Sequence, residues 1–230
     1  MLGILFFLPV TFLMFLYPST HNYNTLDIVD EKVKELDHFK SDSDEVVVLQ
    51  DHLTVLGFFG KNPLNNAVAA SNLKELIYDK FKGFKRFQIV IVVPEASEDE
   101  AMQLKKDISL YEDLKYWHFV YGNQNQIQEV FDSLKTDITL NDQLSTNNVF
   151  IVDKELSQRG RIDDRLDNEI SKNLPIYGLS SYNCIEVAEI KNKMSEDLRI
   201  LFTEYRQKRK GNFDSSSRRE SDLKKSNEQN

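Results

Sequence analysis

Apolar runs that alternate with helical patterns constrain the fold of this chain more than any other feature. Residues 53–59 and 87–93 are almost continuously apolar, as expected for strands covered on both faces of a sheet. Three later groups repeat at helical spacing: Ala70, Leu73, Ile77, Phe81 and Phe84; Ala101, Leu104, Ile108 and Tyr111; and Ile127, Val130, Phe131 and Leu134. This alternation predicts an α/β fold in which helices flank a central sheet.

The remaining elements complete one such domain. Residues 33–50 favour a β-hairpin, because polar turn residues 41–44 separate two apolar runs. Two further strands at 116–120 and 149–152, a hairpin partner at 159–162 and a long helix from Val187 to Tyr205 follow. The predicted order is a hairpin, then β-α-β-α-β-α-β-β-α.

Three short motifs lie along this pattern in a definite order. The first is the loop Gly60-Lys61-Asn62-Pro63-Leu64-Asn65-Asn66, between the strand that ends at Phe59 and a helix that begins near Ala67. The second is Tyr116-Trp-His-Phe-Val-Tyr-Gly122, and the third is Val149-Phe-Ile-Val-Asp153 followed by Gly160.

With these motifs the chain resembles the SCO/SenC family of thioredoxin-like proteins, which deliver copper and act as thiol reductases. The family carries F-T-x-C-P-x-x-C-P at the first place, W-x-F-x-x-G at the second and I-Y-L-I-D-x-x-G at the third. The resemblance covers about residues 33–205. It implies a thioredoxin-like three-layer α/β/α sandwich with an N-terminal β-hairpin.

The chain departs from that family at the residues that carry its chemistry. Asn62 and Asn66 stand where the two cysteines would be, and asparagine forms no thiolate and is a poor ligand for Cu(I). Residues 144–148, where the family has its copper-binding histidine and thioredoxin relatives a cis-proline, contain neither residue type. The resemblance therefore implies a degenerate member without metal or cofactor, whose old active-site loop is marked by Lys61, Asn62, Pro63 and Asn66.

Two interpretations of this loop stay open. Backbone amides ahead of a helix, helped by Lys61, could bind an anion. Alternatively, the loop is a surface turn in which asparagine caps the helix, and this interpretation is favoured.

Cys184 is the one cysteine of the chain, so no intramolecular disulfide is possible. Its place ahead of the last helix could make it a reactive thiol. Burial as a small apolar side chain is the favoured interpretation, because no base lies near it in the sequence.

Other candidate metal ligands show no recognised pattern. The four histidines lack metal-binding spacing, and His118 is expected to alternate with buried aromatic residues on a strand. An acidic cluster comprises Asp163, Asp164, Asp167 and Glu169. Because it lacks the calcium-loop pattern and contains Arg165, with Arg161 nearby, it is expected to be a solvated loop.

Charge divides the chain into two parts. Eight of the 29 Lys and Arg residues, but only four of the 37 Asp and Glu residues, lie from Arg206 onward, so residues 1–205 carry a formal net charge of −12. An acidic body argues against nucleic-acid binding, which needs a basic surface. Residues 206–230 are basic and polar, and are expected to be a disordered tail.

Leu2–Tyr17 is apolar apart from Thr11, which predicts contact with a membrane. An uncleaved anchor is favoured over a cleaved signal, because no cleavage site of small residues follows. The predicted organisation is an anchor or signal-like segment at 1–20, a connector at 21–32, the domain at 33–205 and the tail at 206–230.

These observations predict a membrane-anchored protein whose main domain is periplasmic or otherwise extracytoplasmic. Its function is expected to be non-catalytic: a binding or assembly factor for a protein partner at the membrane, with a possible setting in respiratory-oxidase maturation. Two alternatives stay open. One is a copper chaperone with Cys184, His118 and a methionine as ligands, and the other is a thiol peroxidase or transferase acting through Cys184.

Overall fold

The computed structural model describes residues 11–12, 25–43, 46–110 and 113–209. Within this range, Leu26–Asp214 belongs to one compact unit. Nearly all of the apolar segment Leu2–Tyr17 and of the predicted tail 206–230 lies outside the described residues. None of the described helices is both long enough and apolar enough to cross a bilayer.

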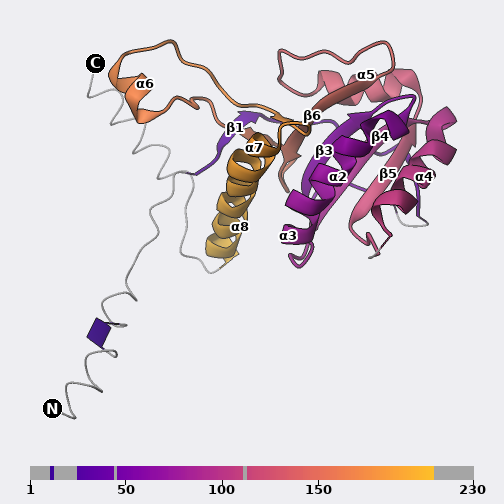
Figure 1. Ribbon diagram of the computed structural model, residues 1–230, viewed down its shortest axis with the longest axis horizontal. Coiled ribbons are helices and arrows are strands. Elements are labelled where there is room, and N and C mark those ends of the chain that lie inside the picture. Colours follow the sequence, from indigo (N-terminus) through magenta and orange to yellow (C-terminus); the bar gives the residue numbers. More distant parts are fainter. Residues whose placement is uncertain (1–10, 13–24, 44–45, 111–112, 210–230) are drawn as a thin grey trace. The chain divides into compact units, whose positions relative to one another are not determined.

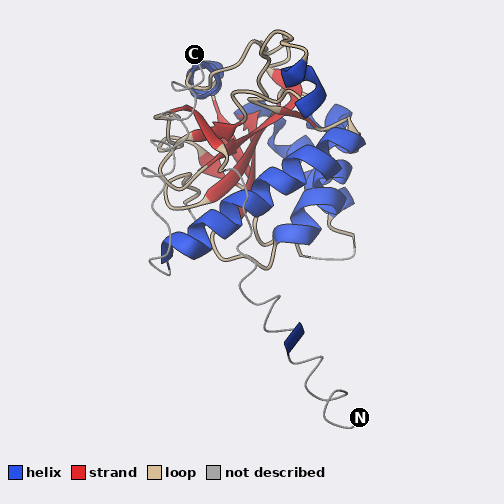
Figure 2. Cartoon of the chain, turned by 90° about the vertical axis from the view of Figure 1, so that its left-hand side faces the viewer, coloured by secondary structure: helices blue, strands red, loops and turns tan. Residues whose placement is uncertain are grey.

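A mixed sheet forms the centre of the domain (Figures 1 and 2). Its strands in the described chain are β1 (Asp27–Asp30), β2 (Lys40–Ser41), β3 (Leu53–Phe59), β4 (Phe87–Pro94), β5 (Trp117–Gly122), β6 (Ser145–Val152), β7 (Gln158–Gly160) and β8 (Tyr182–Asn183). The spatial order is β1-β7-β6-β3-β4-β5-β2, and β8 pairs with β6. All seven residues of β3 are buried, as its continuous apolar sequence predicts.

Helices connect most of these strands. They are α2 (Ala67–Leu73), α3 (Asp79–Phe81), α4 (Glu98–Ile108), α5 (Gln124–Asp132), α6 (Asp167–Ser171), α7 (Val187–Glu189) and α8 (Ser195–Arg209). Two π-helical turns, η2 (Lys74–Tyr78) and η4 (Ile190–Met194), join α2 to α3 and α7 to α8. Two 3-10 turns, η1 (Pro63–Asn66) and η3 (Glu95–Ser97), precede α2 and α4.

The strand pairing is that of a thioredoxin-like fold. β3 pairs in parallel with β4 and antiparallel with β6, and β6 pairs antiparallel with β7. β5 extends the sheet in parallel beyond β4. The predicted α/β, thioredoxin-like fold class is thereby confirmed.

Two apolar clusters cover the two faces of the sheet. The first joins α2, α4 and α8 to side chains such as Ile89, Ile91 and Phe119. The second joins α5 and the chain around Leu36 to side chains on the opposite face, such as Val90. Right-handed crossovers explain why α2 and α4 share one face, because β3, β4 and β5 are parallel and follow one another across the sheet. α5, which leads back to the antiparallel strand β6, packs on the opposite face. The result is the predicted three-layer sandwich.

The predicted hairpin over residues 33–50 is wrong. Among the described residues of this segment, Lys40–Ser41 alone is a strand, and it pairs with β5. The Glu35 carboxylate accepts hydrogen bonds from the amides of Leu49, at 2.7 Å, and Gln50, at 2.8 Å. Since a side chain satisfies these backbone donors, the returning apolar run packs as a loop and forms no strand.

The sheet also begins earlier than the sequence predicts. β1 lies within the predicted connector 21–32 and pairs antiparallel with β7. Behind it, the buried Arg159 guanidinium donates to the Leu26 carbonyl at 2.7 Å, to Asp153 at 2.9 Å and to Glu204 at 2.8 Å. This ion-pair group joins the start of β1 to the β6–β7 hairpin and to α8.

Candidate functional site

The loop Gly60–Asn66 lies at the end of β3, where the chain turns into η1 and α2. β3 is the point at which the order of connection reverses, and the carboxyl ends of strands at such points commonly form binding crevices in α/β proteins. Gly60 has a φ of 66°, and a Cβ atom there would lie 2.1 Å from the Gln143 carbonyl oxygen. The position therefore requires glycine both for its conformation and for its space.

Neither Asn62 nor Asn66 caps a helix with its side chain. Asn66 is buried, and its Nδ2 donates to the Phe59 carbonyl at 2.9 Å. Asn62 is exposed, and its Nδ2 donates to Gln143 Oε1 at 3.1 Å. The favoured interpretation as helix caps is thus wrong in mechanism, because both side chains stabilise the loop itself.

The alternative interpretation, an anion site, loses most of its donors. The Lys61 amide donates to the Gln143 carbonyl at 2.8 Å, and the Lys61 ammonium donates to the Asp142 carbonyl at 3.1 Å. The Asn65 amide donates to the Asn62 carbonyl at 3.1 Å. These groups already have protein acceptors, so the loop offers no prepared cradle for an anion.

A turn at residues 141–145 contacts the loop through Gln143 and overlaps the segment 144–148, where the resemblance places the family's histidine. Asn141 Oδ1 accepts from the amides of Gln143 at 2.9 Å and Ser145 at 3.0 Å. Leu144 is buried with a φ of 59°. This turn immediately precedes the third motif, and it fills the space in front of the loop.

The bonds within the loop and those to the turn at residues 141–145 leave a small exposed surface beyond the end of β3. Lys61, Asn62, Leu64 and Val68 are exposed there, whereas Pro63 is buried. These side chains offer one cation, an amide and two apolar groups, with no general base and no thiol. The arrangement can bind another molecule through hydrogen bonds and apolar contact.

Cys184 is a buried core residue that does not belong to this loop. It follows β8, is fully buried and belongs to the first apolar cluster. Burial, with Glu189 as a smaller contribution, raises the pKa of its thiol far above the ordinary value. A buried thiol of this kind is a poor nucleophile, which agrees with the favoured sequence interpretation.

Cys184 and His118 cannot share a metal ion. On β5, Trp117 and Phe119 point into the first cluster, while Val120 points into the second. Because side chains alternate along a strand, His118 lies on the face of Val120, opposite to Cys184. Among the described residues there is no group of three or more His, Cys, Asp or Glu side chains suited to a metal.

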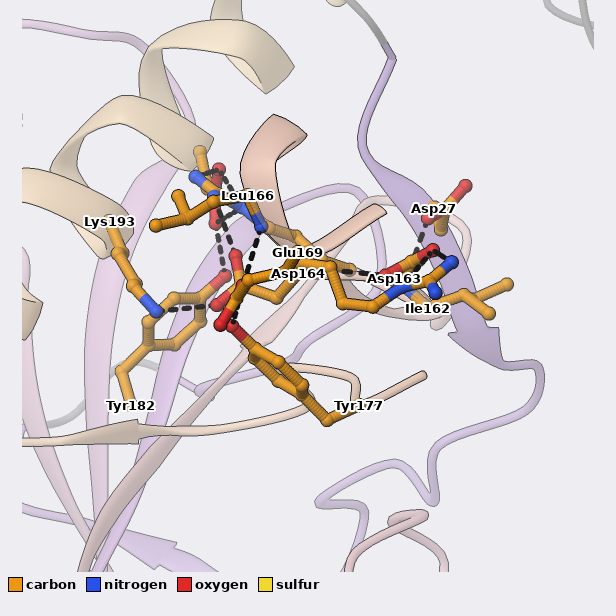
Figure 3. Close-up of polar contacts among 12 residues, drawn as sticks. Asp27, Ile162, Asp163, Asp164, Leu166, Glu169, Tyr177, Tyr182 and Lys193 are labelled. Atoms are coloured by element: carbon orange, nitrogen blue, oxygen red, sulfur yellow. Dashed lines mark hydrogen bonds and ion pairs between the residues drawn. The ribbon is translucent and has the colours of Figure 1, made fainter. Parts of the chain in front are cut away.

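The predicted acidic cluster is an ion-pair network and not only a solvated loop (Figure 3). Asp164 is buried and pairs with Arg161, at 2.8 Å, and with Lys193. Asp163 pairs with Arg165, as the sequence predicts. These residues, with Leu166 and Tyr177, line a hollow of about 270 Å³.

Asp197 in α8 completes the network, and the sequence analysis missed it. Arg161 binds it through Nη2 at 2.7 Å and through Nε at 3.1 Å, and the Tyr182 hydroxyl donates to it at 2.7 Å. Burial raises the pKa of Asp197 in spite of these partners, and it raises the pKa of Tyr182 well above its usual value. The available signal was a carboxylate three residues after Met194 on the apolar face of a helix.

Comparison with known proteins gives neighbours in structure only. No protein-family model and no curated protein sequence matches this chain. Among solved structures, it is similar to BsSco, a member of the Sco family of cytochrome c oxidase assembly proteins. The two share 14% identity with a TM-score of 0.45, over 74% of this chain and 99% of the other.

Two other neighbours have different described chemistry. ScoI of Arabidopsis thaliana, solved with copper bound, shares 11% identity at a TM-score of 0.42, over 70% of this chain and 94% of that one. A yeast mitochondrial 1-Cys peroxiredoxin shares 14% identity with a TM-score of 0.41, over 80% of this chain and 78% of the other. The likeness is one of fold. Sco proteins and thioredoxin-fold oxidoreductases thus both stand among the structural neighbours, as the motif resemblance predicts.

Proposed function

We propose that this protein is a membrane-anchored, non-catalytic binding or assembly factor that uses a thioredoxin-like domain without thiol chemistry. Its domain lies outside the cytoplasm, in the periplasm or an equivalent compartment, and its partner is another protein at the same membrane. The binding surface is the loop that follows β3 and the first turn of α2, with Lys61, Asn62, Leu64 and Val68.

One observation carries the non-catalytic part of the proposal. At the place where thioredoxin-like enzymes hold their cysteines, Asn62 and Asn66 are both engaged in bonds that hold the loop. The chain's one cysteine, Cys184, is fully buried in the core. A redox cycle needs an accessible thiolate and a resolving partner, and neither is present in this arrangement.

The membrane part of the proposal is supported by the sequence of Leu2–Tyr17, which carries no charge. Respiratory-oxidase maturation is the setting that the motif resemblance suggests. Cytochrome-oxidase genes beside the gene for this chain would support that setting.

The experiment measures chemistry and binding separately. The domain from Thr25 onward should reduce neither insulin nor glutathione disulfides above a control without protein. Turnover that disappears in Cys184→Ser would overturn the non-catalytic proposal and restore the thiol enzyme.

Binding is tested in cells with a photo-crosslinking residue at Val68 and, as a matched control, at Met102, which is also an exposed helical position. We expect a crosslinked product of defined mass from Val68 only, and its loss in a chain that also carries Leu64→Asp. Equal products from both positions would show that the loop and the first turn of α2 are not the binding surface.

A further inference from the structure

The segment between β7 and β8, residues 161–179, has an unusual distribution of side chains. Six of the 14 large hydrophobic side chains that are exposed among the described residues lie within it. They are Ile162, Leu166, Ile170, Leu174, Ile176 and Tyr177, with exposed fractions of 42% to 66%. Concentrations of exposed apolar side chains on a folded domain mark sites of interaction with a protein or a membrane.

Polar contacts hold most of this segment to the domain (Figure 3), and Leu179 at its end packs against the first apolar cluster. Arg161 and Leu179 exchange two backbone hydrogen bonds of 2.8 Å at its base, and the Asp164 amide donates to the Tyr177 carbonyl at 2.8 Å. Arg165 Nη1 donates to the Leu174 carbonyl at 2.7 Å. The buried Asp164 side chain is paired on the inner side, while the apolar side chains remain outside. This order is the reverse of an ordinary surface loop, in which apolar groups pack inward.

The segment lies beside the strand through which the chain enters the domain. The Ile162 amide donates to Asp27 Oδ2 at 3.0 Å, so the apolar residues begin beside β1, the strand through which the chain enters the domain. Thr25 follows Tyr17 by eight residues. Eight extended residues span at most about 28 Å, so a bilayer that holds Leu2–Tyr17 cannot be farther than that from Thr25, two residues before β1.

We propose that the exposed apolar side chains of residues 162–177 insert into the headgroup region of the bilayer that holds Leu2–Tyr17. This inference rests on the membrane anchor of the proposed function. Only side chains enter, since irregular backbone is not stable in the hydrocarbon core. Tyr177 has the amphipathic ring that suits the interface.

The charge of the segment identifies the kind of lipid surface. Residues 162–177 contain four acidic and two basic side chains, for a formal charge of −2. Anionic lipid therefore gives no electrostatic gain, and the apolar side chains provide the attraction. Insertion is expected in zwitterionic phosphatidylcholine vesicles.

The test places an environment-sensitive fluorophore on the full chain in phosphatidylcholine vesicles, in a Cys184→Ala background. Ile170→Cys carries the reporter, and Met102→Cys, with 56% exposure against 49%, is the matched control on α4. In vesicles, we expect a blue shift at residue 170 and loss of its emission when nitroxide-labelled lipids are present, with neither change at residue 102. Ile176→Cys provides a second reporter with the same expected result.

Each other outcome overturns the inference in a distinguishable way. If the chain floats with the vesicles while residues 170 and 176 report water, the anchor stands and the insertion is refuted. If the chain does not float with vesicles at all, the anchor and the insertion fail together. A blue shift that needs no vesicles and rises with protein concentration would show that a second copy covers the surface instead.

Discussion

Replacing Cys184 with alanine should make the stability of the domain less sensitive to alkaline pH. In the folded domain the thiol is fully buried, and burial together with Glu189 raises its pKa. In the unfolded chain a cysteine titrates near pH 8.5. A group whose folded pKa is raised contributes stability below its unfolded pKa, and that contribution is lost as the pH rises above this value.

The magnitude follows from this difference. A pH of 10.5 lies about two units above the pKa of the unfolded thiol, which is therefore ionised, whereas the folded thiol keeps its proton. This difference lowers the free energy of unfolding by about 2.7 kcal/mol. Alanine has no such group. Tyr121, Tyr182 and Tyr205 also have raised pKa values, but they act equally in both proteins. The difference between the two proteins therefore isolates the thiol.

Urea unfolding of the chain from Thr25 onward, followed by circular dichroism from pH 7 to 10.5, measures this effect. The difference in unfolding free energy between Cys184→Ala and the parent should be constant below about pH 8 and then move by about 2.7 kcal/mol in favour of the variant by pH 10.5. Parallel curves across the range would refute the reasoning. Rapid reaction of the folded parent with a thiol reagent at pH 8 would lead to the same conclusion and would revive the reactive-thiol alternative.

Three further changes test the loop and the ion-pair group. Asn62→Cys combined with Asn66→Cys should give an intramolecular disulfide, seen as a loss of about 2 Da that reductant reverses; a folded variant that stays unbridged under oxidant would refute the match to the SCO cysteines. Gly60→Ala should lower the unfolding free energy by at least about 1–3 kcal/mol in urea, because its Cβ would meet the 141–145 turn at a positive φ; an unchanged midpoint would contradict this contact. Arg159→Met should cost about 3–5 kcal/mol by the same measurement, since Asp153 stays buried without its cation and Glu204 keeps Lys208 in place of two partners, whereas the exposed pair of Lys34 should lose less than about 1 kcal/mol in Lys34→Met; similar losses would show that burial of the pair is unimportant.

The elements that local sequence could predict are those whose apolar pattern matches their environment. β3, β4 and β6 lie where the apolar runs predict strands, and α4 and α5 follow their helical spacing. Burial on both faces of a strand leaves a continuous apolar run in the sequence, and burial of one stripe of a helix leaves a periodic pattern.

The elements that escaped prediction depend on distant partners. The run ending at Leu49 has the composition of a strand, but Glu35, 14 residues earlier, takes its amide. β1 is short and half polar, and it is a strand only because β7 lies beside it. Tertiary contacts decide whether each of these segments forms a strand, and the local sequence pattern does not encode such contacts.

The same limit applies to the candidate site. The motif order locates the loop at Asn62 and Asn66 and the segment 144–148, but it does not predict that Gln143 bonds to the loop. The network at Asp197 was also missed, because one carboxylate on an apolar helix face does not reveal an arginine 36 residues away. The motifs therefore located the loop, while only the fold showed which residues it touches.

The hydrogen bond from Arg159 to the Leu26 carbonyl has a mechanical consequence. Any pull on the chain ahead of residue 26 enters the domain at β1, an edge strand of four residues with one neighbour. The same guanidinium that holds this carbonyl also holds Asp153 and Glu204, so the load is shared at once between the β6–β7 hairpin and α8. A short edge strand is thus tied to the core at the residue through which such a pull would enter the domain.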